Sequence, residues 1–291
     1  MAENKGLGRR VWLLLAAAVL LTVFTLAGCG KERVPAGSGP EPLKVVTTTS
    51  LIADIVEGVG ADRVTVANII PPASCPGHFD VKPADMQVLA GARIFFVHAW
   101  QGELFTDDLI RSVRNEELQK VVLAIQGNWM TPPVRSEAIE QIAAALAKVD
   151  PDNAGFYAEN AAALQEETAA VGSAMKSRLE AAGATGVKVL VSEMQTGFLR
   201  WAGLDVVAAF GRPEDTSPRQ LEELLALGRQ AGVTLVVDNL QSGHEAGKSI
   251  ARELGAAHVT LSNFPGGFPD TATWALAIER NVELLLGAIA E

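Results

Sequence analysis

The chain has 291 residues, of which 48% are hydrophobic and 20% are charged, and its formal net charge is −10. This length fits one large domain or two of ordinary size, and the acidic balance excludes the basic surface that nucleic-acid binding requires, so we expect no nucleic-acid partner. The presence of only two cysteines excludes a disulfide-rich scaffold and a four-cysteine zinc site.

The first thirty residues have the pattern of an export signal. Basic residues precede an apolar run over residues 11–26, and small residues then lead to Cys29. This order is typical of a secretory signal peptide, and its Leu-Ala-Gly-Cys end is similar to a bacterial lipobox. We predict a lipoprotein signal peptide over residues 1–28 and a lipid on Cys29. The alternative is a transmembrane anchor, since the apolar run is nearly long enough to span a bilayer.

A polar segment follows the predicted signal. Residues 29–43 are rich in Gly, Pro, Ser and charge, which predicts a flexible tether. If Cys29 carries lipid, Cys75 is the only remaining thiol, so no disulfide can form within the mature chain. We therefore expect an exported protein, anchored by lipid to the outer face of a bacterial cytoplasmic membrane, at the cell surface or in the periplasm.

The remaining chain alternates between short β-rich runs and helical patterns, in two series. Such alternation predicts parallel sheets with helices on both faces. We therefore expect an α/β fold with two lobes, residues 44–150 and 184–291, each built on a roughly four-stranded parallel sheet. The predicted strands are Lys44–Thr48, Val64–Ile70, Arg93–His98, Lys120–Ile125, Lys188–Ser192, Val206–Phe210, Thr234–Asp238 and Ala257–Ser262.

One long helical pattern separates the two series, over residues 151–183. Its apolar residues recur every three or four positions, and no proline follows Pro151 within it. This pattern predicts a rigid helix of roughly 45 Å that joins the lobes and limits their movement. The alternative is an ordinary surface helix.

Two helix starts carry capping signals. Ser217 is followed by a proline, with Gln220 three residues further on, which is the pattern of a capping box. Asp270 is expected to cap the last helix.

Residues with binding chemistry gather where the predicted strands end. Ligands of open α/β sheets bind beyond the carboxyl ends of the strands, so we expect a site at these ends. The residues predicted to line it are Thr48, Thr49, Ser50, Trp100, Trp129, Gln195 and Gln241.

Several of these segments occur together in one known family. They include Thr47-Thr48-Thr49-Ser50, Ile70-Pro71-Pro72, Phe79-Asp80, Asp150-Pro151-Asp152 and Asn281-Val282. In this combination the sequence resembles the zinc- and manganese-binding lipoproteins of bacterial ABC metal importers, over roughly residues 44–291. The resemblance implies two lobes joined by a rigid helix, a transported Zn or Mn ion in the cleft, and delivery to an ABC transporter permease. We expect a monomer without a catalytic cofactor.

The ligand positions of that family match this chain only in part. Gly77, beside His78, stands where the family has its first histidine, and Gly127 stands where it has its second. The third ligand corresponds to Glu193 and the fourth, usually an aspartate, to Asn263. Two imidazole donors are therefore missing from the expected positions.

A replacement metal site is still conceivable, because thiolate and imidazole are good ligands for transition metals. The candidate metal ligands are Cys75, His78, His98, Glu193 and Asn263. Two of them have simpler interpretations, His98 as a hydrogen-bonded residue inside one lobe and Cys75 as a small buried hydrophobe. The alternative ligand is a metal chelate or small organic molecule, admitted by the space at the two glycines and carried in the same transport role.

Two other functional classes are less favoured. A thiol enzyme would pair Cys75 with His78 or His98, but no nucleophile elbow, glycine-rich phosphate loop or HExxH motif accompanies them. An adhesin without a ligand does not explain the polar strand ends. We therefore expect a binding protein and no enzymatic activity.

Overall fold

The computed structural model describes residues 41–99, 106–243 and 245–290. The predicted signal peptide, the lipidation site Cys29 and Trp100 lie outside the described residues, as does most of the predicted tether. From Pro42 onward the described residues belong to one compact unit. Among the described helices, none has the length and apolar character that a membrane span requires.

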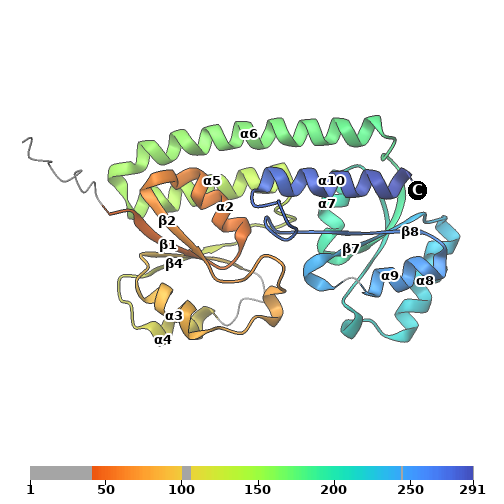
Figure 1. Cartoon of the computed structure of the whole chain (residues 1–291), viewed down its shortest axis with the longest axis horizontal. Helices are drawn as coiled ribbons and strands as arrows, with labels where there is room; N and C mark the ends of the chain where they lie inside the picture. Colours follow the sequence, from red (N-terminus) through yellow and green to blue (C-terminus); the bar gives the residue numbers. More distant parts are fainter. Residues whose placement is uncertain (1–40, 100–105, 244, 291) are drawn as a thin grey trace, which may run out of the picture. The chain divides into compact units, whose positions relative to one another are not determined.

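Two four-stranded parallel sheets form the framework (Figure 1). The strand order is β2-β1-β3-β4 in the first sheet and β6-β5-β7-β8 in the second, and all neighbours pair in parallel. This confirms the predicted fold class. The strands are β1 (Leu43–Thr47), β2 (Val64–Asn68), β3 (Ile94–His98), β4 (Gln119–Leu123), β5 (Lys188–Ser192), β6 (Asp205–Phe210), β7 (Leu235–Asn239) and β8 (Ala257–Leu261).

Helices cover the sheets. In Figure 1 the helices α2, α5, α6 and α10 lie on one side, whereas α3 and α4 cover the other face of the first sheet and α8 and α9 that of the second. The helices are α2 (Ser50–Gly60), α3 (Pro83–Ala90), α4 (Thr106–Val113), α5 (Pro132–Val149), α6 (Ala154–Ala181), α7 (Thr196–Trp201), α8 (Pro218–Ala231), α9 (Glu245–Leu254) and α10 (Trp274–Ala290).

One hydrophobic core runs through both lobes. It contains residues of β1 and β3 from the first sheet and of β5 and β7 from the second, together with the helix layer formed by α2, α5, α6 and α10. Two smaller clusters lie beneath the outer helices, one in each lobe. Because burial of apolar surface is the main favourable term in folding, this shared core ties the two lobes into one structure.

The long helix α6 packs along this core. It contacts α5, α2 and α10. Along its predicted packing face Tyr157, Met175 and Leu179 are buried, and Val171 is half-buried. The helix therefore lies against elements of both lobes.

The capping predictions had different outcomes. Ser217 Oγ accepts a hydrogen bond from the backbone N–H of Gln220, and the capping box is complete, as predicted. The prediction for Asp270 was wrong, because α10 begins only at Trp274 and Thr273 Oγ1 accepts from the N–H of Leu276. The intervening residues remain in the loop, so Asp270 lies too far upstream to cap the helix.

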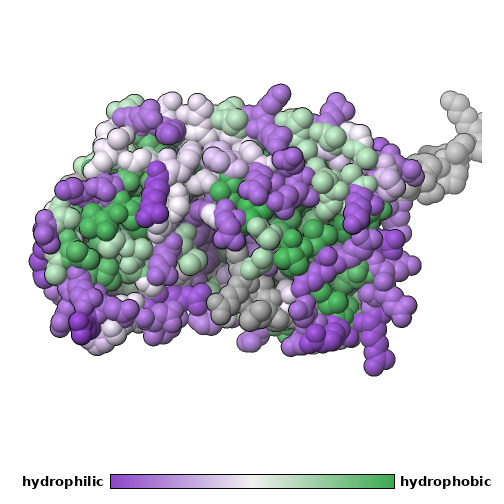
Figure 2. Space-filling view, turned by 180° about the vertical axis from the view of Figure 1, so that it is seen from behind, coloured by the Kyte–Doolittle hydropathy of each residue, from purple (hydrophilic) through white to green (hydrophobic). Residues whose placement is uncertain are grey.

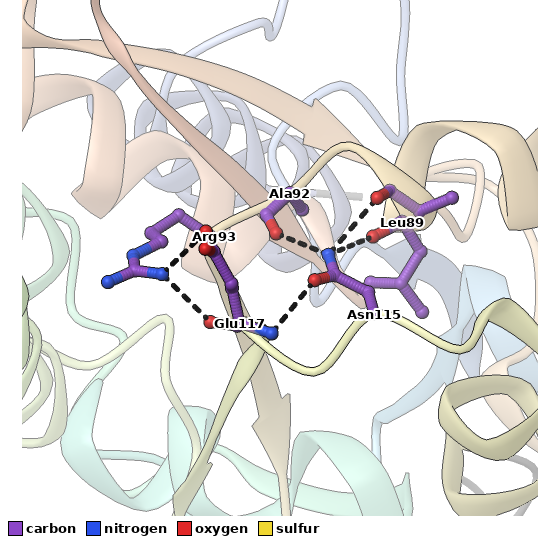
Figure 3. Close-up of polar contacts among 6 residues, drawn as sticks. Leu89, Ala92, Arg93, Asn115 and Glu117 are labelled. Atoms are coloured by element: carbon purple, nitrogen blue, oxygen red, sulfur yellow. Dashed lines mark hydrogen bonds and ion pairs between the residues drawn. The ribbon is translucent and has the colours of Figure 1, made fainter.

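One asparagine organises the connections around β3 (Figure 3). The side-chain amide of Asn115 donates to the carbonyl of Ala92 at 2.8 Å and to that of Leu89 at 3.4 Å. Its Oδ1 accepts from the N–H of Glu117, whose carboxylate pairs with Arg93 at 2.9 Å. These bonds satisfy carbonyls at the end of α3 that have no partner within the helix.

A buried ion pair between two helices of the first lobe also contacts the last helix of the second lobe. Arg135 on α5 is 3% exposed and lies 2.7 Å from the carboxylate of Asp54 on α2. The same carboxylate accepts a hydrogen bond of 3.0 Å from the backbone N–H of Trp274, the first residue of α10. The guanidinium also lies 4.7 Å from the centre of a Trp274 ring, within reach of a cation–π interaction. Asp54 therefore joins α2, α5 and α10 at one point, which we name the helix clamp (Asp54, Arg135 and Trp274).

Large hydrophobic side chains also remain exposed. Figure 2 shows hydrophobic residues in patches on the visible face, interrupted by hydrophilic ones. Among the described residues the most exposed large ones belong to five different elements, namely Val88, Val122, Met194, Leu227 and Leu276. Single exposed residues of this kind are normal on soluble proteins.

Candidate functional site

Each sheet has a topological switch point. Here successive strands of the chain are added first on one side of the starting strand and then on its other side. In the first sheet this point lies between β1 and β3, and in the second between β5 and β7. Loops diverge at such a point and leave room for ligands beyond the carboxyl ends of the strands. In both lobes a buried side-chain hydrogen bond bridges this position.

In the first lobe the bridge joins Thr49, which follows β1, to His98 at the end of β3. Thr49 Oγ1 and His98 Nε2 are 2.8 Å apart, and both side chains are buried. The indole of Trp129 meets the imidazole edge-on, with ring centres 4.3 Å apart. Burial lowers the pKa of His98 from 6.5 to about 3, because the charged imidazolium is poorly solvated there. His98 is therefore neutral at physiological pH.

In the second lobe the bridge joins Gln195, which follows β5, to Asn239 at the end of β7. Gln195 Nε2 donates to Asn239 Oδ1 at 3.1 Å. Gln195 is fully buried, and among the described residues its Oε1 has no hydrogen-bond partner. A buried amide oxygen without a partner is costly, so this atom is available to accept a bond.

Three residues from the strand ends of both lobes form what we name the amide junction (Asn128, Met194 and Asn263). Asn128, which follows β4, donates through Nδ2 to Asn263 Oδ1 at 2.7 Å and to the Met194 carbonyl at 2.9 Å. Asn263 donates to the same carbonyl at 3.0 Å. The predicted fourth ligand position is therefore occupied in a hydrogen-bond network between the lobes.

Further hydrogen bonds between the lobes lie beside the amide junction. Gln241 Nε2 donates to the Pro72 carbonyl at 2.8 Å, and its Oε1 accepts from the backbone N–H of Asn263 at 3.1 Å. Ser50 Oγ donates to the Pro265 carbonyl at 2.8 Å. Ser50 and Gln241, both predicted to line the site, thus form hydrogen bonds from one lobe to the other.

The loop that carries Cys75 meets the second lobe at what we name the arginine junction (Cys75, Gly77 and Arg212). Arg212 follows β6, and its Nη2 lies 2.9 Å from Cys75 Sγ. A Cβ atom placed on Gly77 would lie 3.5 and 3.6 Å from the two terminal nitrogens of this guanidinium. Arg212 therefore contacts the place where a side chain at position 77 would begin.

Gly127 has a backbone that disfavours a histidine. Its φ angle is 106°, and a Cβ atom would lie 2.9 Å from a methyl group of Val134. Residues other than glycine rarely adopt this φ angle. An imidazole at position 127 would require a different local backbone.

The structure separates the predicted metal ligands into different environments. His98 is buried, Cys75 and Asn263 are half-buried, and His78 and Glu193 are exposed. Within the described ranges, no group of three or more His, Cys, Asp or Glu side chains is placed to hold a metal ion. The hydrogen bonds of Thr49, Ser50, Gln195, Gln241 and Asn263 bring the strand ends together, but the candidate donors do not converge in this conformation.

Two residues of the site were missed by the sequence reasoning. Asn128 lies between Gly127 and Trp129, so its neighbours already pointed to this loop. Arg212 is a single arginine in a loop and carried no signal, because its contact with Cys75 spans 137 positions. A third residue without a sequence signal is His258 on β8, whose Nε2 lies 2.7 Å from a carboxylate oxygen of Asp238.

A separate cavity lies at the opposite edge of the second sheet. It is lined by residues at the beginnings of β5, β7 and β8 and at the end of α10, namely Val187, Val233, Thr234, Leu235, Gly255, Ala256, Ala257, Ala288 and Ile289. Among the described lining residues, Thr234 is the one with a polar side chain. The strand carboxyl ends, with their amides and hydroxyls, are the better candidate site.

Curated relatives match part of the chain. This chain is 25% identical over 161 residues to a manganese-binding lipoprotein, MntA, of Halalkalibacterium halodurans. The match covers 51% of this chain and 54% of the relative. It is 26% identical over 169 residues to the MntA lipoprotein of Bacillus subtilis, covering 53% and 55% respectively. The chain thus spans about half the length of the curated relatives it matches.

Solved structures share the fold over most of the chain. A Mn-bound periplasmic metal-binding protein from Candidatus Liberibacter asiaticus superposes with a TM-score of 0.72 at 17% identity, covering 84% of this chain and 98% of that one. A zinc-bound deletion mutant of ZnuA gives a TM-score of 0.71 at 19% identity, covering 85% and 98%. The family model described as zinc-uptake complex component A, periplasmic, matches residues 45–288. As the sequence resemblance predicted, the chain belongs to this ZnuA family.

Proposed function

We propose that this protein is the solute-binding lipoprotein of a bacterial ABC importer, and that it captures a transition metal of the Zn or Mn class between its lobes for delivery to the permease. The observation that carries this proposal is the match of residues 45–288 to the family. The names of the relatives, which are manganese-binding lipoproteins, support it. The proposed role involves binding and release, without a catalytic step or a catalytic cofactor.

The geometry supports a site at the strand ends. Both switch points carry buried hydrogen-bonding side chains, and the amide junction joins the loops beyond them. The metal ligands we propose remain Cys75, His78, His98, Glu193 and Asn263. His98 is neutral, as metal binding through imidazole requires. Because these side chains lie apart in the structure, binding through several of them requires local rearrangement of the loops.

Metal analysis of the purified protein tests this function first, followed by calorimetric titration of the stripped protein with Zn, Mn, Co, Ni and Cu ions. Direct ligation predicts that Cys75→Ala and His78→Ala both weaken binding, whereas Glu140→Ala, an exposed change on α5, leaves it unchanged. Ligand binding should also raise the melting temperature. If no metal binds in any form, free or complexed, the proposed function is wrong.

The membrane anchor is tested separately. We propose that Cys29 carries lipid and holds the protein at the outer face of the cytoplasmic membrane, beside the permease. Cys29→Ser should leave the precursor unprocessed or release the protein from the membrane fraction. If the variant is processed and retained like the wild type, the lipid anchor is wrong.

A further inference from the structure

We propose that the side-chain oxygen of Asn263 and the carbonyl oxygen of Met194 form a cation position between the lobes, and that the side-chain amide of Asn128 competes with the metal for that position. This inference rests on the proposed function, because it names two ligand atoms of the cleft and the residue that limits their availability. It depends on the convergence of the two oxygens, on the orientation of the Asn128 amide and on its close fit against the second lobe.

Two oxygen atoms of the second lobe converge on a single nitrogen of the first. Asn128 Nδ2 donates to Asn263 Oδ1 at 2.7 Å and to the Met194 carbonyl at 2.9 Å. Amide and carbonyl oxygens are suitable ligands for Mn²⁺ and other hard divalent cations. A hard cation held by both oxygens would lie about 2.0–2.6 Å from each of them, in the region that Nδ2 fills. The amide and the cation therefore exclude each other.

A local hydrogen bond determines which end of the Asn128 amide faces these oxygens. Asn128 Oδ1 accepts from the backbone N–H of Met130 at 2.9 Å, so the oxygen is engaged within its own loop and the NH₂ group is directed to the second lobe. The Met130 carbonyl in turn accepts from Trp274 Nε1 of the helix clamp at 3.2 Å. Because an amide NH₂ group can only donate, the cleft presents a donor at the place where a cation requires a ligand atom.

The second lobe fits closely against Asn128 because residue 197, on α7, is glycine. A Cβ atom on Gly197 would lie 3.0 Å from Asn128 Cβ and 3.4 Å from its backbone nitrogen, so even an alanine there would push against this loop. The turn that leads into α7 contains Met194 and, directly before it, Glu193. Glu193 is exposed and is one of the proposed metal ligands. The amide of Asn128 is therefore placed beside a turn that can supply both a carbonyl oxygen and a negative charge to a cation.

Competition by an internal group lowers the apparent affinity for the metal. The two oxygens are both available only in molecules in which the bonds from Asn128 are broken, and the apparent dissociation constant rises in inverse proportion to this fraction. The Met194 carbonyl still accepts from Asn263 Nδ2, at 3.0 Å, when Asn128 leaves, so the two oxygens stay together. Asn128 therefore sets the concentration at which the metal begins to bind.

Calorimetric titration with Mn²⁺ of the stripped wild-type protein and of two Asn128 variants tests the inference. Asn128→Ala removes the competing amide without adding charge, so it should tighten Mn²⁺ binding about threefold or more. Asn128→Asp keeps the oxygen that accepts from Met130 and replaces the NH₂ group with an anionic oxygen, so it should tighten binding about tenfold or more. Gln141→Glu, which adds one negative charge at an exposed position on α5, should leave the affinity unchanged.

A crystal structure of the wild-type protein loaded with Mn²⁺ gives a readout that needs no variant, so a folding defect in the Asn128 variants cannot hide the result. We expect Mn²⁺ bonded to Asn263 Oδ1 and to the Met194 carbonyl, with the Asn128 amide moved away from both oxygens.

The outcomes separate this inference from the proposed function. If Asn128→Ala binds Mn²⁺ as tightly as the wild type or more weakly, the amide does not compete with the metal, and the inference is overturned while metal capture stands. The same holds if the loaded wild type keeps the bond from Asn128 to Asn263 and holds Mn²⁺ elsewhere. If no metal binds to the wild type or to either variant, the proposed function fails, and the inference fails with it.

Discussion

Two of the regions that connect the lobes differ in character, namely the helix layer and the amide junction. In the helix layer a continuous apolar core surrounds the helix clamp, in which Arg135 is 3% exposed. In the amide junction Asn128 and Asn263 are half-buried and the exposed fraction of Met194 is 53%. Burial strengthens electrostatic contacts and makes their disruption costly. The difference indicates that the helix layer fixes the arrangement of the lobes, while the junction is free to change with the ligand.

This division explains how residues at the predicted ligand positions can differ while the family fold is kept. The residues at positions 77 and 127 lie in loops at the strand ends, outside the shared core. Neither glycine belongs to the shared core, although a Cβ atom at Gly127 would lie 2.9 Å from Val134, which packs against that core. Four predictions test the comparison, from the largest expected effect to the smallest.

Removal of the clamp carboxylate should have the largest effect. Asp54→Ala leaves the buried guanidinium of Arg135 unpaired and removes the acceptor for the first N–H of α10, so we expect a loss of about 3–5 kcal/mol in the free energy of unfolding. Denaturant unfolding monitored by circular dichroism measures it. The double change Asp54→Leu with Arg135→Met, which removes both charges, should recover most of the loss. A loss below about 1 kcal/mol for the single variant would contradict the role of the clamp.

A cavity in the helix layer should cost nearly as much. Leu179 on α6 is fully buried in the shared core, so Leu179→Ala should lower the free energy of unfolding by about 3 kcal/mol. Leu276→Ala on α10 is the matched control, because that side chain is 45% exposed and should cost much less. Equal losses in the two variants would show that burial in this layer does not govern stability.

The acid dependence of stability should reveal the buried imidazole. The pKa of His98 is about 3 in the folded protein, against 6.5 for an unperturbed imidazole, so the unfolded chain binds the proton more readily. The contribution of His98 is therefore complete above pH 6.5 and is lost as the pH falls towards 3. Between pH 6.5 and pH 5 we expect a loss of about 2 kcal/mol in the metal-free protein. His98→Gln should lose about 2 kcal/mol less of its free energy of unfolding than the wild type over this pH range. An equal loss in the two proteins would contradict the burial of a neutral imidazole.

Disruption of the amide junction should have the smallest effect on stability. Asn128→Ala removes two hydrogen bonds between the lobes and one local bond from the N–H of Met130, and because these groups are only half-buried we expect a loss of about 1 kcal/mol. The control Gln141→Ala removes an exposed contact on α5 and should stay within about 0.5 kcal/mol of the wild type. A loss for Asn128→Ala as large as that for Asp54→Ala would show that the junction, and not the helix layer, holds the lobes together.

The fold was predictable because its signals are local. Alternation of β-rich and helical segments indicated two parallel sheets, and the capping box at Ser217 marked the start of α8 correctly. The predicted cap at Asp270 failed because aspartate also favours turns. Its φ angle of 60° places it in one. Local patterns therefore defined the elements, with errors at loops.

The site was predictable only in outline. The rule for strand carboxyl ends selected Thr49, Gln195 and Gln241, which the structure places in hydrogen bonds at the switch points and between the lobes. The contacts of Asn128 and Arg212 join residues 135 and 137 positions apart. Such pairings depend on how the lobes meet, and no spacing within the sequence encodes them.

Small-angle X-ray scattering of the protein with and without bound metal tests the central claim most directly. If the shared core and the helix clamp fix the lobes, the curves of the stripped and loaded protein should be nearly superimposable, because only loops at the strand ends rearrange. A large decrease in the radius of gyration on binding would show that the lobes close about the long helix, and would contradict the claim that the helix layer sets their arrangement.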